Sequence, residues 1–169
     1  MKLQLITQFD DQCKDVVSTA TTIADKYTEP LDDTMFKVQE LLKDKDALSV
    51  ADLTKYIALI PVMIYDLVDN MQILGVRTDA AKMQRKAEFN KAYLNQDTGT
   101  VAEKTSTAQV ACEDNQFIED IYTRVYKLCE HKIEVATMLH GSLKKILQWK
   151  LTEMEVTRTD MLSNRGGTF

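Results

Sequence analysis

The two histidines and three cysteines are the residues best suited to bind a metal or act as a nucleophile. His131 and His140 are nine residues apart, which places them on opposite sides of one helix, so they cannot share a metal without ligands from elsewhere. Cys129 lies two residues before His131, and this spacing directs their side chains to different helix faces. The sequence also contains no glycine-rich phosphate loop, Gly-x-Ser-x-Gly elbow or Cys-x-x-Cys pair. We therefore expect a non-enzymatic protein with no metal and no cofactor.

A second candidate chemistry is the binding of single-stranded nucleic acid. Phe89 and Tyr93 are interleaved with basic residues, and single strands bind to cationic grooves that offer aromatic stacking platforms. The alternative is that both rings pack against another helix while Glu113 and Asp120 neutralise the basic side chains. The candidate nucleic-acid-binding residues are Lys82, Arg85, Lys86, Lys91 and Lys104.

The elements that position these residues are predicted to be helices. Only five Gly and two Pro are present, too few for the turns of a sheet-rich domain, and apolar residues recur at steps of three and four. Residues 1–48 are predicted to form an acidic N-terminal helical pair. Its two shorter helices cover residues 7–26 and about 32–42, and they are separated at Thr28-Glu29-Pro30 because proline disfavours helical geometry in the residue before it.

Residues 49–159 are predicted to form a long antiparallel helical hairpin. Its first helix covers about 50–96 and is kinked or broken near Pro61, and its turn is Asp97-Thr98-Gly99. Thr100 and Glu103 form a capping-box pair that begins the second helix, about 101–158. The equal rise of the two helices would bring the basic stretch 77–86 near the acidic stretch 113–120. Residues 160–169 are predicted to be a flexible tail.

The second long helix carries an apolar stripe wider than a strict coiled-coil seam, so it needs more than one neighbour. We therefore expect a homo-oligomeric bundle, with Trp149 as an aromatic anchor at the interface. The predicted oligomer-interface residues are Ile118, Ile121, Val125, Leu128, Leu139, Leu143, Ile146 and Trp149.

Charge and composition favour a soluble protein of the cytoplasm, the host cytoplasm if the chain is viral. The net charge is −5, with a surplus of acids in residues 1–75 and a near balance afterwards, which does not suit a dedicated duplex-DNA binder. The odd number of cysteines favours a reducing compartment. The start lacks a signal-peptide pattern, and the apolar run from Tyr56 to Tyr65 is short and contains Pro61, so we expect no membrane association.

The segment from about Tyr56 to Glu155 resembles the UvsY-like recombination mediators of tailed phages and related small helical phage proteins. The likeness lies in the order of features: a helix ending in a basic and aromatic run (residues 84–94), a polar turn, a capped helix start (residues 100–104), and a long helix with a small-residue section (residues 138–146). The resemblance implies an oligomer that binds single-stranded DNA and helps to load a strand-exchange recombinase. It also implies a Lys-x-Arg-like pair before the turn; Lys86 matches its first position, whereas Glu88 stands at the second.

The leading hypothesis is therefore a non-enzymatic accessory protein of phage DNA recombination or replication, acting as a homo-oligomer on single-stranded DNA with a recombinase as partner. A structural or assembly protein of a phage particle, built as a helical bundle or scaffold, is the alternative from another class. An inhibitor that binds a host protein through the acidic N-terminal helices is a third.

Overall fold

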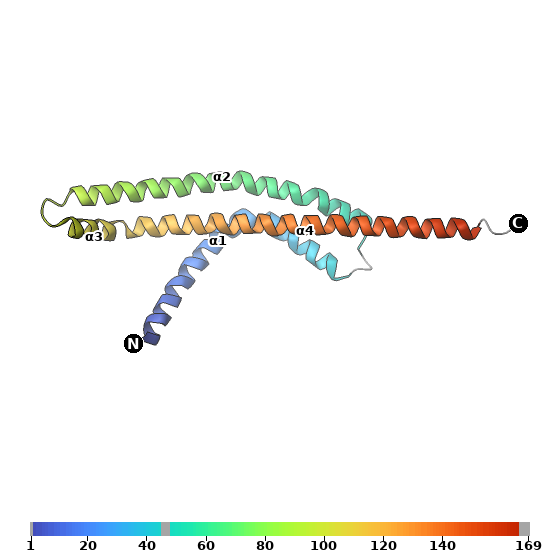
Figure 1. Ribbon diagram of the computed structural model, residues 1–169, viewed down its shortest axis with the longest axis horizontal. Helices are drawn as coiled ribbons and strands as arrows, with labels where there is room; N and C mark the ends of the chain where they lie inside the picture. The colour runs from blue at the N-terminus through green and yellow to red at the C-terminus, as the bar shows by residue number, and fades with distance from the viewer. Residues whose placement is uncertain (1, 45–47, 166–169) are drawn as a thin grey trace. The chain divides into compact units, whose positions relative to one another are not determined.

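The computed structural model describes residues 2–44 and 48–165, with side chains for residues 14–44 and 48–161. Four helices account for nearly all of this part of the chain: α1 (Lys2–Lys43), α2 (Val50–Leu94), α3 (Val101–Ala111) and α4 (Glu113–Arg165) (Figure 1). The described ranges contain no strand. The predicted all-α fold class is confirmed.

The helices form two compact units. The first comprises Met1–Thr28 and Val68–His131, and the second comprises Glu29–Leu67 and Lys132–Phe169. Helices α1, α2 and α4 each contribute to both units, whereas α3 belongs to the first. This grouping differs from the divisions at residues 48 and 159 that the sequence suggested.

Helix α1 is continuous through Pro30, so the prediction of two separate N-terminal helices is wrong. Buried residues recur every three or four positions on both sides of the proline: Ala20, Ala24, Thr28, Leu31, Thr34 and Val38. A proline inside a helix costs about 3 kcal/mol. Burial of Leu31 and Val38 alone contributes about 1.5–3 kcal/mol each, which outweighs that cost. Packing, rather than local propensity, decides the length of α1.

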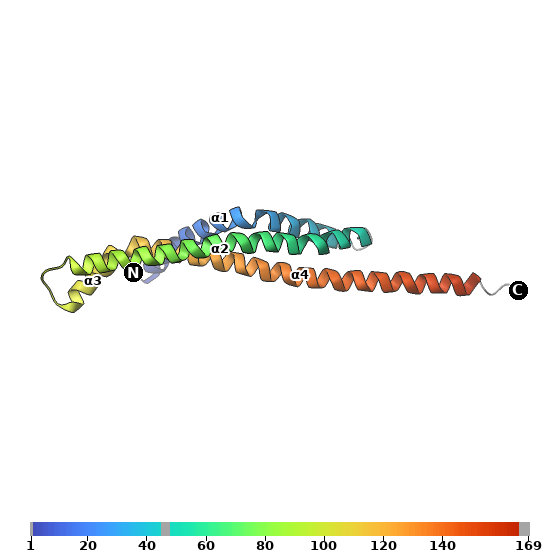
Figure 2. The same cartoon turned by 90° about the horizontal axis from the view of Figure 1, so that it is seen from above.

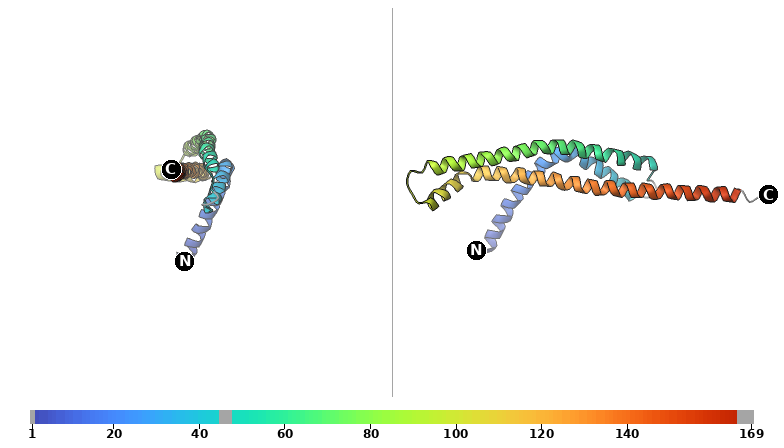
Figure 3. Two further views of the ribbon diagram at one scale, coloured as in Figure 1. Left: turned by 90° about the vertical axis from the view of Figure 1, so that its right-hand side faces the viewer. Right: turned by 45° about the horizontal axis from the view of Figure 1, so that its top comes forward.

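In the second unit, residues 29–43 of α1 lie beside residues 50–67 of α2 (Figure 2 and Figure 3). The core of this unit includes Leu53, Ile60 and Leu143, each exposed by no more than 1%. Helix α2 continues without interruption through the exposed Pro61. The break predicted as one possibility at this residue therefore does not occur. Lys132 of α4 forms an ion pair with Asp32 of α1, which links a second pair of helices in this unit.

The predicted single helix from residue 101 to about 158 is two helices. Helix α3 ends at Ala111 and α4 begins at Glu113, with Cys112 between them at φ −108° and ψ 9°. The backbone N–H and the thiol of Cys112 both donate to the carbonyl oxygen of Gln109, over 3.2 and 3.3 Å. This backbone conformation is open to any residue, so neither glycine nor proline marks the break. Figure 2 and the right panel of Figure 3 show the two helix axes at an angle.

The end of α4 also differs from its prediction. The helix continues to Arg165, past the expected end near Arg158 and into the segment predicted to be a flexible tail. The rest of that predicted tail, residues 166–169, lies outside the described residues.

The turn between α2 and α3 follows its predicted chemistry. Gly99 has φ +115°, a conformation that residues with a side chain rarely adopt. The Thr100 hydroxyl accepts from the Glu103 backbone N–H, and the Glu103 carboxylate accepts from the Thr100 backbone N–H over 2.7 Å. The Thr100 hydroxyl also donates to the Glu103 carboxylate over 3.0 Å, and the backbone and hydroxyl donors together hold the pKa of Glu103 below its usual 4.5, with the backbone donor as the larger cause. The predicted capping box is confirmed.

Candidate nucleic-acid interface

The candidate site lies on the C-terminal half of α2, within the first unit. Arg85, Lys86, Phe89 and Asn90 line a groove of about 360 Å³. Lys86, Phe89 and Asn90 follow Arg85 by one, four and five positions, and this spacing brings the four side chains close together on one side of the helix. The groove thus combines two cations, an aromatic ring and an amide.

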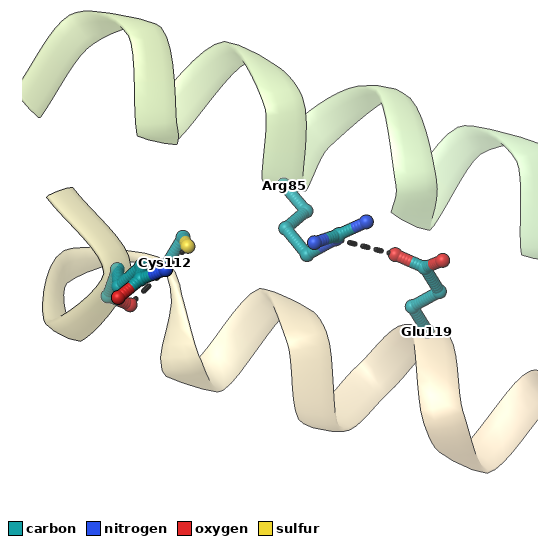
Figure 4. Close-up of polar contacts among 4 residues, drawn as sticks. Arg85, Cys112 and Glu119 are labelled. Atoms are coloured by element: carbon teal, nitrogen blue, oxygen red, sulfur yellow. Dashed lines mark hydrogen bonds and ion pairs between the residues drawn. The ribbon is translucent and has the colours of Figure 1, made fainter. Parts of the chain in front are cut away.

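Arg85 is held in place by a residue of α4. Its Nε donates to Glu119 Oε2 over 2.6 Å, and the exposed fractions of the two side chains are 32% and 18% (Figure 4). The pair is one instance of the predicted proximity between the basic stretch 77–86 and the acidic stretch 113–120. The guanidinium of Arg77, at the start of the basic stretch, donates instead to the Tyr27 hydroxyl of α1 over 2.9 Å. Glu119 therefore both orients Arg85 and neutralises part of its charge.

Lys82 and Lys86 are exposed, and neither has a hydrogen bond or ion pair with another residue of the described ranges. They are four positions apart and so lie on the same side of α2. Arg85 lies between them in the sequence and points toward α4. These three residues are the part of the predicted cationic site that the fold brings together.

Lys91 and Lys104 do not join this group. Lys91 is exposed but lies five positions after Lys86, about 140° further round the helix at 3.6 residues per turn. Lys104 is half-buried, and its ammonium donates to the Gln96 carbonyl oxygen over 2.5 Å. It satisfies a carbonyl just beyond α2, a role that basic residues near helix C-termini often have. Two of the five predicted cations are thus placed away from the groove.

The aromatic residues of the site stack on each other. The ring centroids of Phe89 and Tyr93 are 6.3 Å apart and their planes differ by 14°, and both side chains are half-buried. Phe89 therefore packs against Tyr93 and also lines the groove. Asn90 is the groove residue that the sequence prediction missed. The available signal was its position four residues after Lys86, which places it on the same helix face.

The predicted oligomer interface is divided by the fold. Ile121, Val125 and Leu143 are exposed by 7%, 0% and 1%, so they belong to the core of a single chain and are not available to a partner. The half-buried members of the set are Leu128, Leu139 and Ile146. Ile118 and Trp149 are exposed. The prediction failed for the buried residues because apolar periodicity shows that one face of a helix is covered. It does not show whether the covering helix belongs to the same chain or to a partner.

Two other features concern alternative chemistries. Among the described residues no group of three or more His, Cys, Asp and Glu side chains is arranged to hold a metal ion. One described helix, α2, contains an apolar window long enough to cross a membrane, and 22% of that window is buried. Length and composition alone are weak evidence for a span, because core helices share them.

Comparison with known proteins provides no relative: no protein family, curated protein or solved structure matches this chain. The likeness to UvsY-like mediators therefore stays a prediction from sequence pattern.

Proposed function

We propose that this chain is a non-enzymatic accessory protein of phage DNA recombination or replication that binds single-stranded DNA at the α2 groove. In this proposal the protein forms a homo-oligomer, has a recombinase as its partner and acts in the host cytoplasm. It also retains the finer fold prediction, a long antiparallel helical hairpin within an oligomeric bundle. The observation that carries the proposal is the groove lined by Arg85, Lys86, Phe89 and Asn90.

The side chains of the groove match the two parts of a nucleotide. Lys86 and Arg85 in the groove, with Lys82 one helical turn before Lys86 and outside the groove lining, supply positive charge for phosphates. The half-buried ring of Phe89 offers an apolar surface for a base. Asn90 adds an amide that donates and accepts hydrogen bonds at base edges. Single strands suit this arrangement better than a duplex, whose bases are already stacked and whose higher charge density favours a strongly basic protein.

Binding of a labelled single-stranded oligonucleotide, followed by fluorescence anisotropy, tests the proposal. With Lys82 and Lys86 engaged and Arg85 paired with Glu119, the logarithm of the affinity is expected to fall with the logarithm of the salt concentration with a slope of about 1.4. Replacing Lys82 and Lys86 together by Glu should abolish most of the binding and reduce this slope by about 1.4. The double replacement of Lys144 and Lys145 by Glu makes the same change in net charge on α4 and is the matched control. Absence of binding by the unaltered protein at micromolar concentration and low salt would refute the proposal.

A structural or assembly protein is the second candidate, and a specific observation favours it. The outer face of α2 exposes large apolar side chains in the second unit, among them Val62 at 52% and Tyr65 at 68%. Exposed apolar groups of this kind are typical of protein interaction surfaces. In this role the charge reversal at Lys82 and Lys86 should leave the function intact, whereas Tyr65→Lys should abolish assembly.

A further inference from the structure

The C-terminal part of α4 is a helix without cover. Every residue from 151 to 161 is exposed, including the apolar residues Leu151 at 45%, Met154 at 60% and Met161 at 64%. An isolated helical segment of this length is only marginally stable in water. The uncovered segment follows Lys150, whose ammonium donates to the Leu48 carbonyl oxygen over 2.6 Å. The described part of the chain provides no surface that covers the apolar side chains of this segment.

The apolar residues of the uncovered segment continue a seam that the second unit already covers. Leu147 is half-buried, and Met154 and Met161 follow it at intervals of seven residues. Leu143, which is 1% exposed, lies one turn earlier on the same side of the helix. Lys150 and Thr157 occupy the alternate positions of the seam. A seven-residue repeat of this kind is the pattern of a coiled coil. In the uncovered segment, Met154 and Met161 take one core position and Thr157 takes the other.

The charges beside the seam favour a second copy of this chain in parallel orientation. In a parallel pair, the residue directly before the core position that Met154 and Met161 occupy faces, on the other helix, the residue whose number is five higher. Glu153 of one copy then faces Arg158 of the other, and the symmetry of the pair repeats this contact. In an antiparallel pair, positions of the same kind face each other, so Glu153 meets Glu153 or Asp160 of the other copy and gains no opposite charge. Neither Glu153 nor Arg158 has an ion pair within the described ranges.

We propose that residues 151–161 of α4 pair with the same segment of a second copy as a short parallel two-stranded coiled coil. The inference rests on the self-association in the proposed function and gives it an interface and a direction. Because the uncovered repeat spans only about one and a half heptads and places Thr157 in the core, association is expected to depend on protein concentration over the micromolar range. The pairing requires no DNA.

Sedimentation equilibrium of the full chain without DNA tests the proposal. The mass is expected to rise from one copy toward two with concentration. Replacing Met154 and Met161 together by Glu should keep the protein monomeric, because both side chains lie in the seam. Val156→Glu is the matched control: this residue is 56% exposed but lies on the opposite side of the helix, so its replacement should leave the mass unchanged. A monomer at all concentrations, or a double variant that associates as well as the unaltered protein, would overturn the proposal. Loss of DNA binding alone would leave it standing.

Two further measurements test the parallel orientation. Glu153→Arg and Arg158→Glu should each weaken association roughly fivefold to tenfold, and their combination should restore it. Thr157→Cys should form a disulfide between copies under mild oxidation, because equivalent core positions meet in a parallel pair. Thr159→Cys, on the outer side of the helix, should form none. Single charge variants that associate normally, or cross-linking that is equal at both threonines, would exclude the parallel pair. Thermal unfolding should show that each variant keeps the fold of the rest of the chain, since all the altered residues are exposed.

Discussion

Replacing Glu119 by Gln is expected to strengthen the binding of single-stranded DNA at the α2 groove. In the folded protein, the Glu119 carboxylate accepts from Arg85 Nε over 2.6 Å and neutralises one of the groove's cations. Gln has nearly the same shape and an amide oxygen that still accepts a hydrogen bond, but it carries no charge. The substitution thus keeps the side chain's volume and releases the charge of Arg85 for a phosphate.

The size of the effect follows from one additional phosphate contact. Arg85 is 32% exposed, so its guanidinium reaches solvent without a change of fold. One more contact steepens the salt dependence of single-strand binding by about 0.7 in the logarithmic slope. A partly exposed charge contact is worth up to about 1 kcal/mol, which corresponds to about fivefold tighter binding at low salt.

Anisotropy titrations over a range of salt concentrations measure both quantities. Asp120→Asn is the matched control, because Asp120 is the next residue of α4, is exposed, and has no ion pair within the described ranges. Both variants change the net charge equally, so a rise in affinity common to both reports long-range electrostatics only. An unchanged salt slope in Glu119→Gln, or equal effects of the two substitutions, would refute a role for Arg85 as a restrained phosphate ligand.

Three further predictions concern stability and pH. Leu143→Ala should lower the free energy of unfolding by about 2–5 kcal/mol, because Leu143 is only 1% exposed. Met138→Ala should lower it by about 0.5 kcal/mol or less, because Met138 is 65% exposed. Urea denaturation of the two variants measures the difference. Pro30→Ala should raise the free energy of unfolding by about 1–2 kcal/mol, because the exposed proline removes a hydrogen bond from α1. NMR titration should find the pKa of Glu103 below 4.5, and Thr100→Ala should raise it only in part, because the backbone N–H that chiefly lowers it remains.

Each of these predictions has a result that would contradict it. Equal losses for Leu143→Ala and Met138→Ala would show that Leu143 is not in the core. Destabilisation by Pro30→Ala would show that the ring makes contacts that α1 needs. For Glu103, a folded-state pKa below the unfolded value means that its stabilising contribution is complete above pH 4.5 and is lost as the pH falls through the lowered pKa. A loss of this stabilising contribution as the pH rises above 4.5 would contradict the lowered pKa.

The all-α class and the turn before α3 are predictable because their causes are local. Apolar residues at steps of three and four reveal the period of a helix whatever it packs against. The left-handed backbone of Gly99 and the reciprocal hydrogen bonds of Thr100 and Glu103 lie within five consecutive residues. Such chemistry is complete within one turn of chain, so it can be read without knowledge of the fold.

The helix boundaries that were predicted wrongly depend on packing. Local propensity alone ends a helix near Pro30, and only the burial of Leu31 and Val38 shows why α1 continues. Conversely, the break at Cys112 has no local breaker, and it places a thiol that is 3% exposed in the interior. Both boundaries are decided by the energy of burial, which depends on neighbours that are remote in the sequence.

For the candidate site, the sequence by itself determined which residues carry charge and which of them share a helix face, as Lys82 and Lys86 do. Only the tertiary structure decided which charges remain available. Arg85 is paired with a carboxylate 34 positions away, and Lys104 is held by the Gln96 carbonyl. The type of a side chain is a property of its own residue, whereas its free charge depends on what the fold brings within hydrogen-bonding distance.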